Sequence, residues 1–176
     1  MQAAHGGDGD APRTQRKQRT TIALDCAVLI SALLSAIHVL TLALGLGAVF
    51  ARGRALARPL DEAGWRRLLA ADNVWGIAAA LWIVSGLGRV FFGGKERAFY
   101  WHNGFFWVKL ALFALVFALE IVPMTTFIRA RAALGRKTAL PRFSAESLRR
   151  INSAETILVV AIVFIAAFMA RGAWMF

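Results

Sequence analysis

Cysteine, acidic residues and recognisable catalytic motifs are scarce in this chain of 176 residues. Its single cysteine, Cys26, cannot form an internal disulfide, so the cysteine count says nothing about the redox compartment. The sequence also lacks a glycine-rich phosphate loop, a Ser/His/Asp nucleophile arrangement and a zinc-spaced set of Cys and His. Hydrolytic and nucleotide chemistry therefore have little support.

Four long apolar runs dominate what is present. They are Leu24 to Phe50, Val74 to Phe92, Phe105 to Ile128 and Thr156 to Phe176, each of about 19 to 27 residues. At a rise of about 1.5 Å per residue, a helix of that length crosses a hydrocarbon core of about 30 Å. A hydrophobic share of 59% and a mean hydropathy of +0.58 also exceed those of ordinary soluble domains. The sequence therefore predicts an integral membrane protein.

The predicted fold is all-α, a bundle of four transmembrane helices formed by residues 24–176. Helices are expected rather than barrel strands because the runs show no alternation and every backbone group must be paired inside the bilayer. The spans leave no room for a separate globular domain. Residues 1–23 are polar, with several glycines followed by a basic stretch, and are predicted to form a disordered tail.

Lysine and arginine are unevenly distributed about the spans. Twelve fall on the side of the first and third loops: Arg52, Arg54, Arg58, Arg66, Arg67, Arg129, Arg131, Arg136, Lys137, Arg142, Arg149 and Arg150. Seven fall on the other side, four of them in the tail. Because cytoplasmic loops are enriched in basic residues, both termini are predicted to lie outside the cytoplasm, although the basic tail argues for the opposite.

Helix boundaries are expected at residues that can cap or bend a helix. Asp72 or Asn73 is predicted to cap the second helix, and Ser144 to cap an approach helix that continues into the fourth span. Pro123 lies inside the third span, where it removes a backbone hydrogen bond and is expected to kink the helix. Asp72 and Arg89 bracket the second span and are predicted not to pair with each other.

Ionisable residues inside the spans carry most of the functional information, because a charge at bilayer depth costs at least about 2.5 to 3.5 kcal/mol. They are His38 in the first span, Arg89 in the second, and Lys109 and Glu120 in the third. Lys109 and Glu120 share a helix face but lie about 16 Å apart along it, so they cannot pair. Each residue also has a structural interpretation: a hydrogen-bonded His38, a Lys109 that snorkels to the interface, and a protonated or arginine-paired Glu120.

The stretch from Ala71 to Pro123 resembles a bacterial membrane-protein family, that of domain of unknown function 2214. The resemblance rests on Asp72, Gly76, Gly86, Arg89, Val90, Lys95, Tyr100, Asn103, Phe106, Trp107, Lys109, Phe113 and Pro123. It extends to His38 and to the closing segment from Met169 to Gly172. The family tends to carry two adjacent histidines where this chain has Ile37 and His38, and a small polar residue in place of Glu120.

That family is distantly similar to a wider group that includes the copper-resistance membrane protein D and the haem-containing protoporphyrinogen oxidase of the J type. The oxidase pattern is a histidine in the first helix and a lysine after an aromatic residue early in the third, matched here by His38 and Lys109. The resemblance implies a site for haem b or a porphyrin, with His38 as the iron ligand. Propionates would find cations at Arg89, Lys95 and Arg97.

Two functions stay open from the sequence. One is a haem-binding redox protein, and the other is a non-enzymatic membrane protein that transports a small solute or metal ion or serves as a partner subunit. Copper is less favoured than haem because Cys26 and the methionines are scattered. The expected partners are the lipid bilayer, a haem or porphyrin, and a second copy of the chain. No nucleic-acid partner is expected, since the basic residues flank spans and suit anionic lipid, and the expected location is the bacterial inner membrane.

Overall fold

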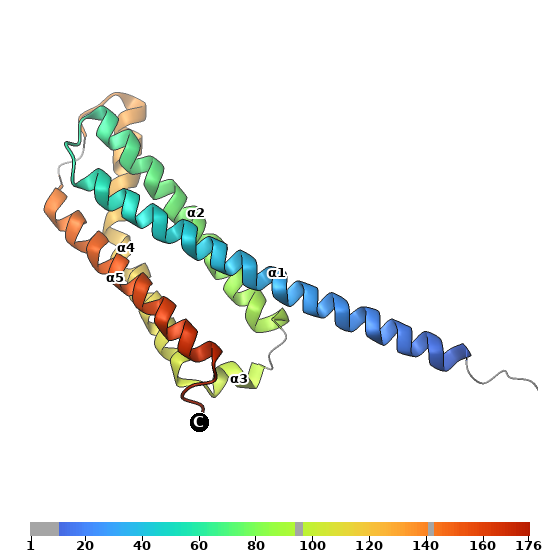
Figure 1. Cartoon of the computed structure of the whole chain (residues 1–176). Helices are drawn as coiled ribbons and strands as arrows, with labels where there is room; N and C mark the ends of the chain where they lie inside the picture. The colour runs from blue at the N-terminus through green and yellow to red at the C-terminus, as the bar shows by residue number, and fades with distance from the viewer. Residues whose placement is uncertain (1–10, 94–96, 141–142) are drawn as a thin grey trace, which may run out of the picture.

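The computed structural model describes residues 11–93, 97–140 and 143–176, and these ranges form five helices. They are α1 (Ala11–Leu56), α2 (Glu62–Phe92), the short α3 (Arg97–Trp101), α4 (Gly104–Arg136) and α5 (Ala145–Ala170) (Figure 1). All except α3 are long and apolar enough to cross a membrane. The prediction of an all-α protein with four spans is confirmed.

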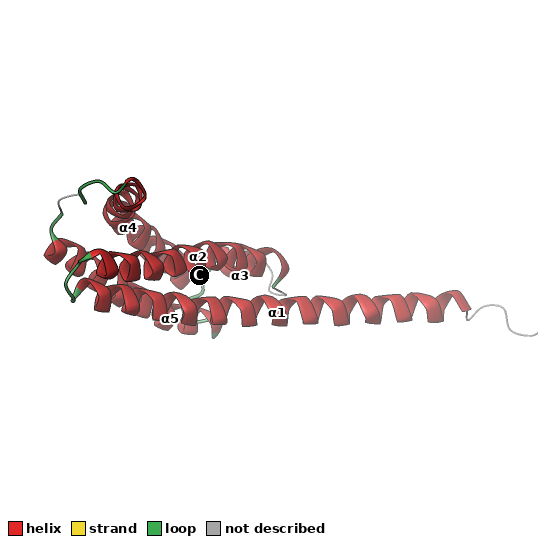
Figure 2. Ribbon diagram, turned by 90° about the horizontal axis from the view of Figure 1, so that it is seen from above, coloured by secondary structure: helices red, strands yellow, loops and turns green. Residues whose placement is uncertain are grey.

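The four long helices pack as an unevenly closed bundle. α1 lies along α2, and α5 lies against both α1 and α4, whereas α2 and α4 meet at few points. The N-terminal half of α1 continues past the other helices as a single straight rod (Figures 1 and 2). The Ser31 hydroxyl donates to the carbonyl of Gly93 at 2.8 Å, so Ser31 lies level with the end of α2. The packed part of α1 therefore begins near Ser31.

Two clusters of buried apolar side chains hold the bundle together. One lies near the α1–α2 and α4–α5 loops, where Trp65 packs edge-to-face against Phe127 with ring centroids 6.5 Å apart. The other lies deeper, around Trp75, Trp82 and Val159. Between helices in lipid, such packing replaces the hydrophobic effect as the main attraction, because lipid tails are as apolar as the side chains.

The start of α2 differs from the sequence prediction. The helix begins at Glu62, and its cap is Asp61, whose carboxylate accepts from the Gly64 amide at 2.6 Å. The prediction that Asp72 or Asn73 caps α2 is wrong, because buried Trp65 and Leu68 extend the helix before the apolar run begins. The Ser144 cap of α5 is confirmed, with the Ser147 amide donating to its hydroxyl at 3.1 Å.

The two ends of the chain also differ from expectation. α1 begins at Ala11, so residues 11–23 are helical rather than a disordered tail, while residues 1–10 lie outside the described ranges. After Pro12, which a first helical turn tolerates, this stretch contains neither glycine nor proline. At the other end α5 stops at Ala170, and Gly172 follows with a φ of +74°. The closing segment then turns back, where the Gly104 amide donates to the Trp174 carbonyl at 3.0 Å.

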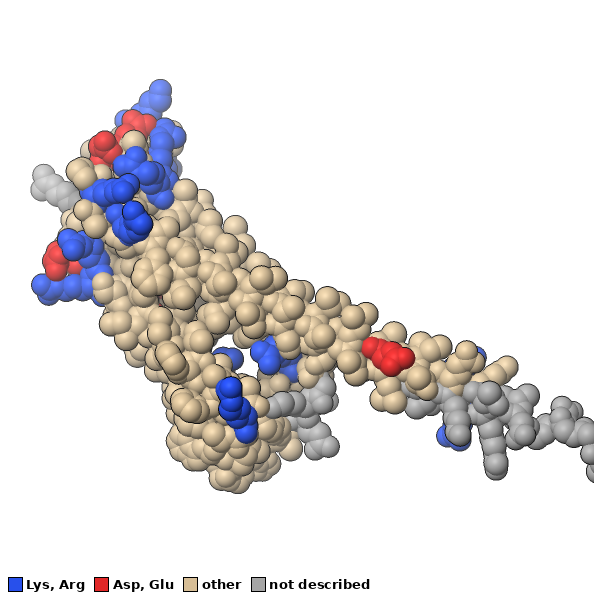
Figure 3. Space-filling model, viewed as in Figure 1, with Lys and Arg blue, Asp and Glu red and all other residues tan. Residues whose placement is uncertain are grey.

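Basic side chains gather at the end of the bundle that carries the α1–α2 and α4–α5 loops (Figure 3). Both loops lie at one end, as a four-span topology requires. Arg52, which the sequence count assigns to the first loop, belongs to α1 and is fully buried. Removing it lowers the count by one and leaves the bias in place. The orientation relative to the cytoplasm stays a prediction.

Candidate functional site

A cavity of about 180 Å³ lies among the helices near the end that carries α3. His38 of α1, Arg89 of α2 and Lys109 of α4 all line it, and the same three residues also line an adjoining cavity of about 330 Å³. The rest of the wall is mostly apolar: Ile83, Leu87, Val90, Phe106, Leu110 and Phe113. Because α2 and α4 meet at few points, space remains between them. The structure thus brings the three predicted site residues together.

His38 and Lys109 lie at similar depths in the bundle. His38 follows Ser31 by seven residues, which is about 10 Å along the helix. Lys109 follows the start of α4 at Gly104 by five residues, which is about 7 Å. The depths are compared from Ser31 rather than from Leu24, where the apolar run begins, because the packed part of α1 begins near Ser31.

Both ring nitrogens of His38 have partners on α2. Trp82 Nε1 donates to His38 Nε2 at 3.0 Å, and His38 Nδ1 lies 2.9 Å from the Ser85 hydroxyl. An indole N–H can only donate, so Nε2 is the acceptor and Nδ1 carries the proton that reaches Ser85. Gly86 lies against the same ring, where a Cβ would meet the imidazole at 3.4 Å, an ordinary van der Waals contact. The interpretation of His38 as hydrogen-bonded to a neighbouring helix is confirmed.

Arg89 and Lys109 supply positive charge to the cavity. Among the described residues, the ion pairs involve neither of them. Burial raises the pKa of the Tyr100 phenol, with the charge of Arg89 opposing the shift, so the hydroxyl stays protonated and donates to the Arg89 carbonyl at 3.3 Å. Cations in an apolar wall without a carboxylate partner favour an anionic ligand. Lys95 and the side chain of Arg97, predicted to assist, lie outside the described residues.

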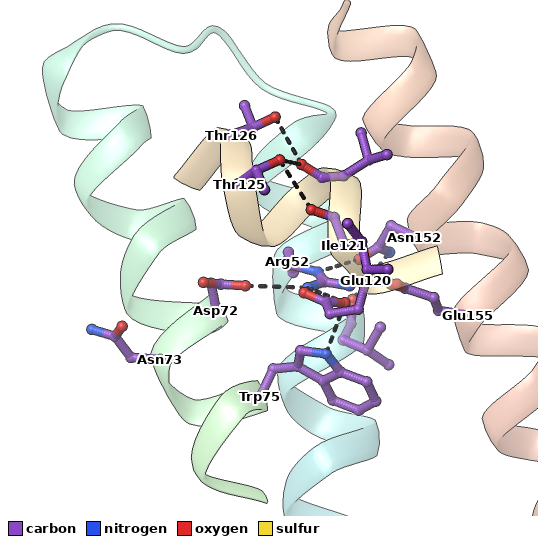
Figure 4. Close-up of polar contacts among 12 residues, drawn as sticks. Arg52, Asp72, Asn73, Trp75, Glu120, Ile121, Thr125, Thr126, Asn152 and Glu155 are labelled. Atoms are coloured by element: carbon purple, nitrogen blue, oxygen red, sulfur yellow. Dashed lines mark hydrogen bonds and ion pairs between the residues drawn. The ribbon is translucent and has the colours of Figure 1, made fainter. Parts of the chain in front are cut away.

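A second polar site, which we call the Arg52 cluster, lies inside the bundle toward the basic loops (Figure 4). It contains Arg52 of α1, Asp72 and Trp75 of α2, Glu120 and Arg131 of α4, and Asn152 and Glu155 of α5. Arg52 and Glu155 are both 0% exposed. All four long helices therefore meet at one buried ionic centre.

Arg52 uses its whole guanidinium in this cluster. Nε donates to Asn152 at 2.8 Å, Nη1 donates to Asp72 at 3.2 Å and to Glu120 at 2.8 Å, and Nη2 donates to Glu155. The planar fork of arginine suits this, since it presents its donors in fixed directions. The interpretation of Glu120 as arginine-paired is confirmed, with Arg52 as its partner.

Asp72 has a role that the sequence prediction did not foresee. Its second carboxylate oxygen accepts from Arg131 at 2.7 Å, and Arg131 also donates to Asn73 at 2.7 Å. Asp72 therefore joins Arg52 to Arg131, and the prediction that it does not pair with Arg89 is confirmed.

Sequence reasoning missed the buried ionic roles of Arg52, Asp72 and Glu155, because each stands beside an apolar run, where a charged residue suits a loop or a helix cap. A usable signal is helical spacing: Glu155 lies four positions before Val159, which is buried in the core. A charge on the same face as core residues must be buried with them. The partner could not be read from this signal, since Arg52 and Glu155 are 103 residues apart in the chain.

The part of the chain that the structure describes contains no group of three His, Cys, Asp or Glu side chains that could hold a metal ion. A family model described as a predicted membrane protein, DUF2214, matches residues 30–173. The chain belongs to this DUF2214 family. The matched range begins beside Ser31, where α1 joins the bundle, and includes both polar sites of this DUF2214 protein. No curated protein and no solved structure matches the chain.

Proposed function

We propose that this membrane protein binds haem b in the cavity lined by His38, Arg89 and Lys109 and takes part in electron transfer in the bacterial inner membrane. One observation carries the proposal: two cations without a carboxylate partner among the described residues share an apolar intramembrane cavity with an imidazole. A ligand matched to that wall has a flat apolar body and anionic groups. Haem has both, in its macrocycle and its propionates.

The side chains of His38, Arg89 and Lys109 suit haem once the hydrogen bond from Trp82 to His38 is broken. His38 Nδ1 is held by Ser85, which fixes the ring in the way that outer partners orient metal-binding histidines. The other ring nitrogen, Nε2, accepts from Trp82, so ligation through Nε2 requires the indole N–H to give way. Arg89 and Lys109 would hold the propionates as charge-assisted hydrogen-bond donors. When bound, haem b would supply reversible one-electron chemistry.

The cavity volumes are consistent with a ligand that occupies both spaces. The first cavity, about 180 Å³, is below the range of about 300 to 1,000 Å³ typical of ligand sites. The adjoining space of about 330 Å³ is lined by the same histidine and cations. A ligand that spans both would contact α1, α2, α4 and α5 together.

Haem binding is tested by purification from haem-replete cells and by titration of the purified protein with hemin. We expect a Soret band that shifts on reduction, its loss in His38→Ala, and a weakened or shifted band in Lys109→Ala. Trp82→Phe should strengthen binding because it removes the donor that competes for Nε2. The matched control is His102→Ala, an exposed histidine outside the cavity wall. A colourless wild-type protein that also fails to take up hemin would overturn the proposal.

A second candidate is a non-enzymatic protein that binds or transports an anionic, lipid-soluble solute at the same cations. The complete pairing of His38 within the protein favours it, since such a ligand needs no free imidazole nitrogen. Binding of a fluorescent fatty acid would then depend on Arg89 and Lys109 and tolerate His38→Gln. Dependence on His38 with a Soret band would favour haem instead.

A further inference from the structure

The Arg52 cluster has more negative than positive formal charge. Its carboxyl groups belong to Asp72, Glu120 and Glu155, and its guanidinium groups to Arg52 and Arg131. With every group ionised, three negative charges face two positive ones inside the bundle. A single bound proton would make the cluster neutral. Neutrality matters here because an unbalanced charge inside a membrane protein is costly.

One oxygen of Glu155 is left without a donor. Glu155 is 0% exposed, and Oε2 accepts from Arg52, but Oε1 has no hydrogen-bond partner among the described residues. A buried carboxylate oxygen without a donor is unfavourable. A neutral carboxyl group removes the problem, since its O–H can itself donate.

Glu120 is the carboxylate beside Glu155 in this cluster. It accepts from Arg52 Nη1, and Glu155 accepts from Nη2 of the same guanidinium, so the two carboxyl groups lie on neighbouring nitrogens (Figure 4). The charged groups that face Glu155 are Arg52 from α1, Asp72 from α2 and Glu120 from α4, with Arg131 on the far side of Asp72. We propose that the Arg52 cluster is an intramembrane binding site for one exchangeable proton, carried by Glu155 and shared with Glu120.

The proton has a route to the end of the bundle that carries the basic loops. The side chains of Glu120, Asp72 and Arg131 are 18%, 11% and 35% exposed, so all three are more exposed than Glu155, which is fully buried, and Arg131 at the loop end is the most exposed. On the other side, the space toward the His38 cavity is apolar and only about 10 Å³, lined by Trp75, Trp82 and Val159 among others. The proton site therefore exchanges with one face of the membrane, and it does not rest on the proposed haem function.

Infrared spectroscopy of the reconstituted full-length protein tests the site, because a protonated carboxyl group absorbs apart from a carboxylate and shifts in D₂O. At neutral pH the wild-type protein should show one such band, and it should shift in D₂O while the protein stays folded. Glu155→Gln should remove the band. Glu120→Gln should remove it too, since the remaining charges balance when Glu155 ionises. Glu62→Gln, an exposed carboxylate on α2, is the matched control and should retain it.

A wild-type protein without the band at neutral pH would overturn the proposal, and so would a band that persists in Glu155→Gln or does not shift in D₂O. Stability gives a second measurement, because glutamine is close in shape to a neutral glutamic acid. Glu155→Gln should unfold at nearly the wild-type denaturant midpoint. A fall as large as that of Arg52→Ala would show that Glu155 is ionised and refute the site, whatever the state of the haem cavity.

Discussion

Replacing Arg52 by alanine should strongly destabilise this protein. Arg52 is 0% exposed, and its guanidinium donates to Asp72, Glu120, Asn152 and Glu155. Alanine would leave those carboxyl groups buried without their common cation. Removal of one partner from a buried ion pair costs about 3 to 5 kcal/mol. Against a total stability of about 5 to 15 kcal/mol, this is a large fraction.

The measurement is reversible unfolding in mixed detergent micelles, followed by circular dichroism, with the free energy of unfolding compared between variants. Arg52→Lys should fall between wild type and Arg52→Ala, because lysine keeps the charge but lacks the planar fork. The control is Arg66→Ala, which breaks the exposed pair with Glu62 and should cost less than about 1 kcal/mol. If Arg52→Ala lost no more than Arg66→Ala, the cluster would not be the ionic centre that joins the helices.

Three further outcomes are expected. Asp61→Ala should lower the free energy of unfolding by about 0.5 to 2 kcal/mol through loss of the α2 cap, and no change would mean that the Gly64 amide finds another acceptor. Gly104→Ala should lower the free energy of unfolding by about 1 to 3 kcal/mol, because its Cβ would lie 2.4 Å from the Trp174 ring. The control Gly135→Ala should be tolerated, since a Cβ there meets nothing within 4 Å, and equal thermal midpoints of the two variants would contradict this packing. In the α1–α2 and α4–α5 loops, an inserted reporter enzyme that works only in the cytoplasm should be active, and one that works only in the periplasm should be inactive. The opposite result would reverse the predicted orientation.

The membrane fold could be predicted from the sequence because the features that decide it are local. A run of about 20 apolar residues is long enough to cross the hydrocarbon core, and an isolated span must form its backbone hydrogen bonds within itself. Those conditions hold for each helix separately, so the number and type of spans follow without knowledge of packing. The Ser144 cap is local in the same sense, since donor and acceptor are three residues apart. The start of α2 was predicted wrongly, at Asp72 or Asn73, because the burial of Trp65 that extends the helix back to the Asp61 cap depends on tertiary packing.

What only the tertiary structure decided is which polar residues meet. His38, Arg89 and Lys109 could be named from the sequence because each interrupts an apolar run, but their shared cavity depends on where α1 enters the bundle. The Arg52 cluster was out of reach, because its charged members other than Glu120 lie beside the runs and its contacts join residues 20 to 103 positions apart. Such pairings arise from the relative rotation and depth of neighbouring helices. Hydropathy, which is measured along one helix at a time, carries no information about either.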